Sequence, residues 1–65
     1  MYRYEVFLAE VKIDGRVHRN VSASVYSSSN DHPMMNEIVE RLALDFRTEE
    51  SSISYSSNRM TIKKF

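Results

Sequence analysis

The dipeptide Asp14-Gly15 constrains the fold of this chain more than any other feature, because it separates two runs rich in strand-forming residues. Asp-Gly is among the strongest signals for a two-residue β-hairpin turn. Such a loop fixes the register of the two strands, and a slip of one residue would turn every side chain to the opposite face. In this register, apolar residues oppose one another at three successive positions, namely Leu8 with Val21, Val6 with Ala23, and Tyr4 with Val25. The turn and the apolar pattern therefore predict the same hairpin independently.

The other face of this hairpin is mixed in character and not purely polar. It carries Phe7, Val11 and Tyr26 among charged and polar residues. Two explanations fit this pattern. Either a β-bulge turns part of the strand toward the core, or the sheet has a partly apolar second surface. The sequence pattern is compatible with both.

An amphipathic helix is predicted over residues 33–47. The run Asn30-Asp31-His32-Pro33 supplies cap residues and an early proline, which together indicate a helix start. Glu49 and Glu50 would oppose the negative end of the helix dipole, so the helix should stop near Arg47. The apolar residues at helical spacing are Met35, Ile38, Val39, Leu42 and Phe46.

The last fifteen or so residues predict a second hairpin with Ser57-Asn58 as its loop. Tyr55 would then pair with Met60, and Ile53 with Ile62. The order ββαββ follows, which predicts an α+β domain over residues 1–65 with two layers, one amphipathic helix packed on a four-stranded antiparallel sheet. The expected core consists of Tyr4, Val6, Leu8, Val21, Ala23, Val25, the apolar helix residues, Ile53, Tyr55, Met60 and Ile62.

The size of the chain limits the stability that this core can supply. A domain of 65 residues gains only about 3–5 kcal/mol from a single core. The chain contains no Cys, so neither disulfides nor thiolate zinc sites can add to that figure. Oligomerisation or partner binding is the remaining source of stability.

Charge and hydropathy restrict the surroundings in which the chain can act. Nine basic and nine acidic residues give a formal net charge of zero, which supplies no general attraction to nucleic acid or to an anionic membrane. The longest apolar runs fall well short of the roughly 18 residues of a membrane span, and the first residues alternate in polarity instead of forming a signal-peptide core. We therefore expect a cytoplasmic protein with no membrane partner.

Residues with catalytic or ligand-binding chemistry are few and scattered. His18 and His32 lie at a turn and at a helix start, without the spacing of metal ligands. The serines lack a Gly-x-Ser-x-Gly elbow, and the single Gly leaves no phosphate-binding loop. Glu37 and Glu40 lie one turn apart on the predicted helix surface, where no pocket is expected to shift a pKa. We expect no enzyme activity, no catalytic residue, no cofactor and no metal.

The leading hypothesis is a non-enzymatic interaction protein that binds a protein partner as an adaptor, regulator or inhibitor. The length and composition of the chain are typical of small accessory proteins of bacteria and their viruses. The predicted partner-binding residues are Phe7, Val11 and Tyr26 on the second sheet face and Leu44 on the back of the helix. The same sheet face would form a homodimer.

The alternative hypothesis is a small nucleic-acid-binding protein that uses the C-terminal hairpin. Tyr55, Arg59, Lys63 and Lys64, followed by Phe65, combine aromatic and basic groups that could stack on a base and contact phosphate. The same cations would equally serve to keep an edge strand from pairing with other chains.

Overall fold

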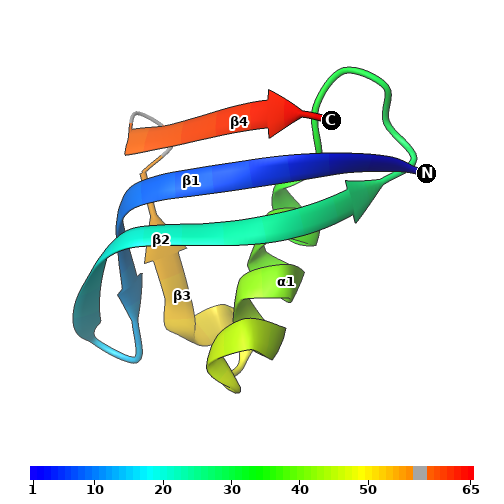
Figure 1. The fold of residues 1–65 in the computed structure, drawn as a ribbon. Helices are drawn as coiled ribbons and strands as arrows, with labels where there is room; N and C mark the ends of the chain where they lie inside the picture. Colours follow the sequence, from blue (N-terminus) through cyan, green and yellow to red (C-terminus); the bar gives the residue numbers. More distant parts are fainter. Residues whose placement is uncertain (57–58) are drawn as a thin grey trace.

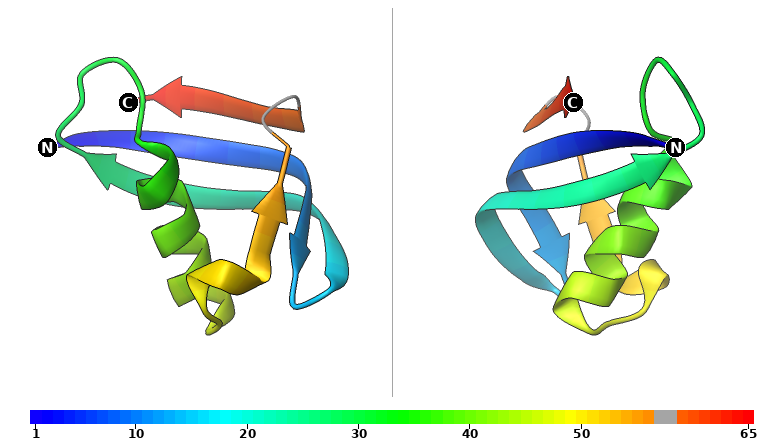
Figure 2. Two further views of the ribbon diagram at one scale, coloured as in Figure 1. Left: turned by 180° about the vertical axis from the view of Figure 1, so that it is seen from behind. Right: turned by 45° about the vertical axis from the view of Figure 1, so that its right-hand side comes forward.

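The computed structural model of the chain describes residues 1–56 and 59–65. Its elements follow one another in the predicted order (Figure 1), namely β1 (Tyr2–Ile13), β2 (Arg16–Ser27), α1 (Met35–Phe46), the short 3-10 helix η1 (Glu50–Ser52), β3 (Ile53–Tyr55) and β4 (Met60–Lys64). All strand pairs are antiparallel, and α1 packs on one face of the single sheet (Figure 2). The predicted α+β ββαββ fold is confirmed.

The first hairpin has the predicted turn and register. Asp14 and Gly15 have φ angles of 51° and 79°, and a tight hairpin turn of this kind requires positive φ at both central residues. The three predicted pairs are present, with Tyr4 opposite Val25, Val6 opposite Ala23 and Leu8 opposite Val21. Local turn chemistry and apolar alternation were sufficient to define the turn and the register of this hairpin.

The predicted second hairpin is wrong in its pairing. Strand β3 pairs with residues 11–13 of β1, and β4 pairs with residues 4–8 of β1, so Tyr55 lies opposite Val11 and Met60 lies opposite Leu8. The predicted loop at Ser57-Asn58 lies outside the described residues. The physical reason is that β1 is long and has a free edge. Two short strands on this edge form more backbone hydrogen bonds than β3, with three residues, could form in a hairpin with β4.

The first hairpin changes its buried face near its middle. The buried residues of β1 are Tyr4, Val6 and Leu8 in its first part, but Val11 and Ile13 in its last part. The ladder to β2 is interrupted between the pair at Leu8 and the pair at Glu10. Opposite this point Asn20 has a φ of 56°, a left-handed conformation that breaks the alternation of a strand. Both strands bend there (Figure 1), so a re-aimed strand is the correct explanation for Val11.

Helix α1 is slightly shorter than predicted and begins in a different way. Met34 is the N-cap residue, and its backbone N–H donates to Oε1 of Glu37 at 2.8 Å. The prediction that the run Asn30-Asp31 caps the helix is therefore wrong, because Glu37 reaches back to close the first turn. The end is as predicted, since Arg47 is left-handed with a φ of 53°. No helix in the described part of the chain is long and apolar enough to cross a membrane.

The core lies between α1 and the concave face of the sheet. Ile38 and Leu42 of the helix are buried against the sheet residues. The other buried members of this cluster are Val6, Leu8, Val11, Ile13, Ala23 and Val25, and Val21, Phe46, Ile53, Tyr55, Met60 and Ile62 pack against it while partly buried. Met35, the first residue of α1, was predicted to join the core but is exposed.

Candidate functional site

The four residues predicted to bind a partner lie in three different environments. Phe7 and Tyr26 are 41% and 54% exposed on the sheet, and Leu44 is 66% exposed on α1. Val11 is only 1% exposed and belongs to the core. Its prediction as a surface residue is wrong, because the bend at Asn20 turns this part of β1 toward the helix.

Phe7 and Tyr26 belong to a surface that we call the outer face, the side of the sheet that points away from α1 in the half containing residues 2–8 of β1. Its members, from the strand register and the contacts of the C-terminal ring, are Arg3, Glu5, Phe7, Ser22, Ser24, Tyr26, Thr61, Lys63 and Phe65. They form rows across three strands. In one row Phe7 lies between Ser22 and Thr61, and in the last row Arg3 lies between Tyr26 and Phe65.

Aromatic rings and cations lie next to one another on the outer face. The Arg3 guanidinium carbon is 4.9 Å from the Phe65 ring centroid, and Lys63 Nζ is 5.6 Å from it, both within the range of cation–π attraction. The Glu5 carboxylate accepts a hydrogen bond from Ser24 Oγ at 3.0 Å and lies 3.8 Å from Arg3. Sequence reasoning did not connect Phe65 with this face, because it placed β4 in a hairpin with β3. The alternation of β4 reveals the connection once that strand is paired with β1.

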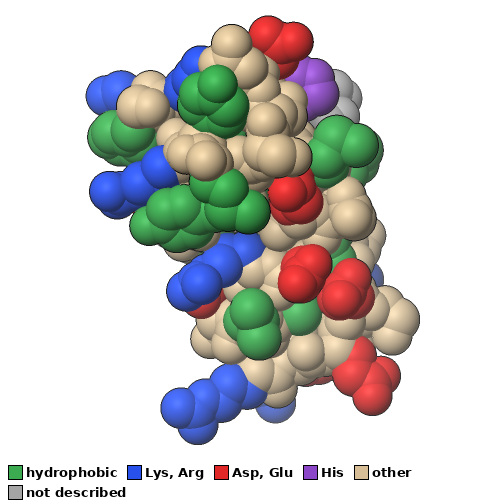
Figure 3. All heavy atoms as spheres, turned by 90° about the vertical axis from the view of Figure 1, so that its right-hand side faces the viewer, with side chains coloured by type: hydrophobic (Ala, Val, Ile, Leu, Met, Phe, Trp, Pro, Cys, Tyr) green, Lys and Arg blue, Asp and Glu red, His purple; other side chains and the backbone are tan. Residues whose placement is uncertain are grey.

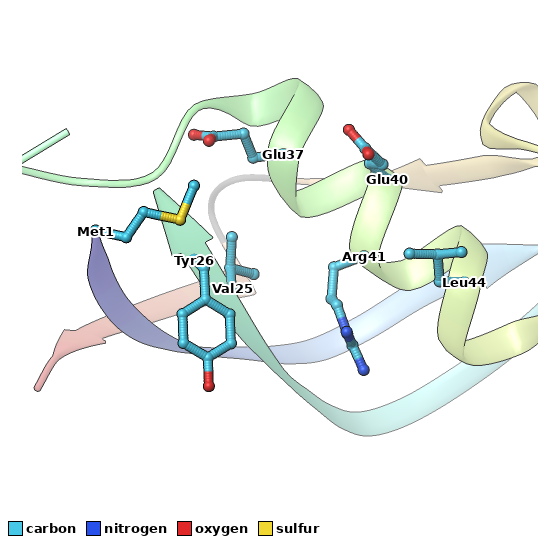
Figure 4. A pocket seen from close by; sticks show the side chains of 7 residues that line it. All are labelled: Met1, Val25, Tyr26, Glu37, Glu40, Arg41 and Leu44. Atoms are coloured by element: carbon cyan, nitrogen blue, oxygen red, sulfur yellow. The ribbon is translucent and has the colours of Figure 1, made fainter. Parts of the chain in front are cut away.

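A shallow hollow of about 280 Å³ lies between β2 and α1. Figure 4 shows its lining, which comes from the N-terminus, β2 and the helix and consists of Met1, Val25, Tyr26, Glu37, Glu40, Arg41 and Leu44. The hollow brings Tyr26 and Leu44 together, although they were predicted for different surfaces. Figure 3 shows hydrophobic side chains between a basic and an acidic flank on the side of the molecule where the N-terminus lies. The sequence carries no signal for this hollow, because it depends on how far the helix lies from the edge of the sheet.

A network of hydrogen bonds joins the end of β2 to the start of α1. Ser27 is fully buried, and its hydroxyl donates to Oε1 of Glu37 at 2.7 Å. The hydrogen bond from the Met34 backbone, and after it the one from Ser27, lower the pKa of Glu37 below its ordinary value of 4.5. A carboxylate that is stabilised in its charged form is a weak base, so it does not activate Ser27 as a nucleophile. The arrangement fixes the connection between strand and helix.

Tyr4 anchors the loop that follows β2. Its hydroxyl donates to the carbonyl of Ser29, whose backbone N–H in turn donates to Ser27 Oγ at 3.1 Å. Burial, and after it the charge of Asp31, raises the pKa of Tyr4. The phenol therefore stays protonated and acts as a donor that holds the loop against the core.

The two histidines lie apart and have separate local contacts. His18 packs its ring edge-on against Phe46 with the ring centroids 5.0 Å apart, and Nδ1 of His32 lies 3.1 Å from the carbonyl of Pro33. Within residues 1–56 and 59–65, the acidic and histidine side chains form no group of three or more that could hold a metal ion. The chemistry of these residues is that of packing and local hydrogen bonding.

The residues of the nucleic-acid hypothesis are divided among three places. Tyr55 and Arg59 border a polar hollow beside Glu10, and Arg59 forms an ion pair with Glu10 at 3.4 Å. Burial raises the pKa of Tyr55, whose ring packs against the core. Lys63 lies on the outer face, whereas Lys64 donates to the carbonyl of Asn30 at 2.9 Å. They do not form one continuous basic surface.

Comparison of the chain with protein-family models, with curated proteins and with solved structures gave no match. The surfaces of the molecule are therefore the basis for its function. Of these, the outer face combines the largest number of exposed aromatic side chains with unburied charges.

Proposed function

We propose that this chain is a small non-enzymatic interaction protein that binds another protein through its outer face. The observation that carries the proposal is the exposure of three aromatic rings on one side of the sheet, where Phe7, Tyr26 and Phe65 are 41%, 54% and 62% exposed. Aromatic residues are enriched in protein interfaces and often contribute most of the binding energy. A domain this small, with a core this limited, gains from covering them.

The charges of the outer face indicate the chemistry of the partner. Arg3 and Lys63 flank the Phe65 ring, whereas Glu5, the acid of this face, accepts a hydrogen bond from Ser24 and lies close to Arg3. The complementary partner surface is apolar where it meets the rings and acidic where it meets the two cations. Such a contact suits an adaptor, a regulator or an inhibitor.

The polar side chains that could carry out catalysis form hydrogen bonds or packing contacts within the fold, and this supports a non-enzymatic role. The buried Ser27 hydroxyl is committed to Glu37, and the lowered pKa of that carboxylate opposes proton abstraction. His18 packs on Phe46 as part of the hydrophobic contacts. Each of these groups has a role in holding strands, helix and loops together.

The test is an affinity capture that compares matched variants of the tagged domain. Lysate of the source cells is passed over the wild type, over Phe7→Ser with Phe65→Ser, and over Leu44→Ser as an exposed control on α1. We expect a protein that binds the wild type and the control but not the double variant. Circular dichroism confirms that all three are folded. Capture of the same proteins by all three, or of none by any, contradicts the proposal.

Nucleic-acid binding is the second candidate, and the same outer face favours it, because an exposed Phe65 ring lies next to the cationic groups of Arg3 and Lys63. The two candidates differ in their dependence on salt. Phosphate contacts make affinity fall steeply as the salt concentration rises, whereas apolar contacts resist salt. Captured material that is nuclease-sensitive and released by moderate salt would identify the nucleic-acid function and exclude the protein partner.

A further inference from the structure

Strand β2 is the edge of the sheet, and it is long. The strand order β2-β1-β3, with β4 also on β1, places every described strand on the other side of β1 from β2. The twelve residues Arg16–Ser27 therefore pair with β1 along one side and with no described strand along the other. Asn20, with a φ of 56°, interrupts this edge. The regular free edge is therefore the part that follows it, residues 21–27, and its backbone N–H and C=O groups can bind another strand.

The two edges of the sheet differ in how they are protected against such pairing. Natural proteins protect edge strands with charged residues, proline or interruptions. The β3–β4 edge is divided into two short strands and carries Lys63 and Lys64. The β2 edge contains neither a charged residue nor a proline from residue 20 to residue 27. The part of β2 that follows Asn20 is therefore the less protected of the two edges, whereas the part before it carries Arg16 and Arg19.

Space for a further strand exists beside this edge. The hollow between β2 and α1 begins at Val25 and Tyr26 and extends to Glu40, Arg41 and Leu44 of the helix. Because Val25 and Tyr26 of β2 form one wall of the hollow, a strand added to β2 would lie next to it. The occupant that fits is one with an uncharged strand and with charges that complement Glu40 and Arg41.

We propose that this occupant is a second copy of the chain, which pairs its own β2 antiparallel with β2 about a two-fold axis. Residues directly opposite in an antiparallel pair lie on the same face of the sheet. An axis through Ala23 therefore sets Val21 opposite Val25 of the second copy, and Ser22 opposite Ser24. In this register each Arg19 faces Ser27, so no like charges meet along the strands. The β2 edge is thus complementary to itself, as a two-fold interface requires.

The helices add complementary charges to the same interface. The two-fold axis places both copies of α1 on the same side of the joined sheet and antiparallel to each other. Glu40 and Arg41 are neighbours on the helix and both line the hollow. Arg41 forms an ion pair with Asp45 of its own helix at 2.8 Å, and in the proposed dimer it also lies near Glu40 of the second copy. Leu44, which is 66% exposed in the single chain, gains an apolar neighbour in the dimer.

This dimer uses the edge of the sheet and leaves Phe7 and Phe65 of the outer face free for a partner, whereas Tyr26 also lines the hollow at the edge. The dimer does not require the function proposed above. It also differs from self-association through the outer face around Phe7, which the sequence predicted. The two arrangements respond differently to substitution, because one depends on β2 and the other on the exposed rings.

The test is analytical ultracentrifugation of the full chain over a range of protein concentrations. The disrupting variant is Ser22→Lys, which adds a charged side chain to the exposed edge. The matched control is Thr61→Lys, because Ser22 and Thr61 lie on either side of Phe7 on the outer face, one on each edge strand. We expect a dimer of the wild type at tens of micromolar, an increase of about tenfold or more in the dissociation constant for Ser22→Lys, and no change for Thr61→Lys.

A charge reversal supplies a second and independent measurement. Arg41→Glu should weaken the dimer, and adding Glu40→Arg should recover part of the affinity, because the pair across the axis is exchanged but kept, whereas the pair between Arg41 and Asp45 is lost in both variants. Circular dichroism reports whether each variant is folded. A wild type that is monomeric at hundreds of micromolar overturns the proposal. So does a dimer that resists Ser22→Lys but dissociates with Thr61→Lys or with Phe7→Ser.

Discussion

Replacement of Leu42 by alanine should be among the most damaging single substitutions in this domain. Leu42 is fully buried at the centre of α1, in the cluster that includes Leu8 and Val25. The substitution removes the equivalent of about three methylene groups, which at about 0.8 kcal/mol each is a loss of about 2.4 kcal/mol in transfer free energy. The cavity that remains brings the total cost to about 2–5 kcal/mol.

This cost is comparable with the whole stability of the domain. A core of this size supplies about 3–5 kcal/mol, so Leu42→Ala should be partly or wholly unfolded at 25 °C. Urea unfolding followed by circular dichroism measures the effect. All variants must be compared at one protein concentration, since dimerisation would make stability depend on it. Ile38→Val is a milder companion on the same helix face and should lower the free energy of unfolding by about 0.5–1.5 kcal/mol.

The control is Leu44→Ala, two residues further along the same helix but 66% exposed. We expect it to change the free energy of unfolding of the monomer by no more than about 0.5 kcal/mol. A loss of less than about 1 kcal/mol for Leu42→Ala would refute the assignment of the helix face that packs on the sheet. An equal loss for both leucines would do the same.

Three further predictions test the bend, the helix start and the loop. Asn20→Val should lower the free energy of unfolding by about 1–2 kcal/mol, because a β-branched residue strains the left-handed conformation, whereas Asn20→Gly should not lower it. The pKa of Glu37 is lower in the folded state, so the contribution of the Glu37 carboxylate to stability is present above pH 4.5 and is lost as the pH falls through the folded pKa. Glu37→Gln should therefore make the midpoint of urea unfolding less sensitive to a decrease in pH. Tyr4→Phe removes the donor to Ser29 and should lower the free energy of unfolding by about 0.5–1.5 kcal/mol, as thermal unfolding will show.

The elements that the sequence predicted correctly are those specified by neighbouring residues. Asp14-Gly15 fixes a turn by its backbone preferences, and the alternation on either side of it fixes the register. The helix follows in the same way from apolar residues at helical spacing, and it ends close to Arg47 as the charges of Glu49 and Glu50 suggested. Each of these signals lies within a few residues of the structure that it specifies.

The pairing of the last two strands was beyond such signals. Nothing in the residues around Ser57-Asn58 states that Met60 lies beside Leu8, more than fifty positions earlier in the chain. Apolar matching was satisfied equally well by the wrong hairpin, because Ile53, Tyr55, Met60 and Ile62 all face the core in both arrangements. Alternation indicates which residues point inward, but it does not indicate which strand lies next to which.

The candidate surfaces could be predicted only in part, and the conformation of Asn20 explains why. An asparagine within a strand has no sequence mark that distinguishes an extended from a left-handed backbone, although it tolerates the latter better than most residues. The left-handed conformation moves Val11 from the surface to the core, and with it Ile13, so the apolar part of the outer face is smaller and lies toward Phe7, Tyr26 and Phe65. The same bend lets the sheet curve around α1. The core thereby gains two side chains that a flat hairpin would expose, while residues 20–27 of β2 keep the uncharged edge at which we place the second copy.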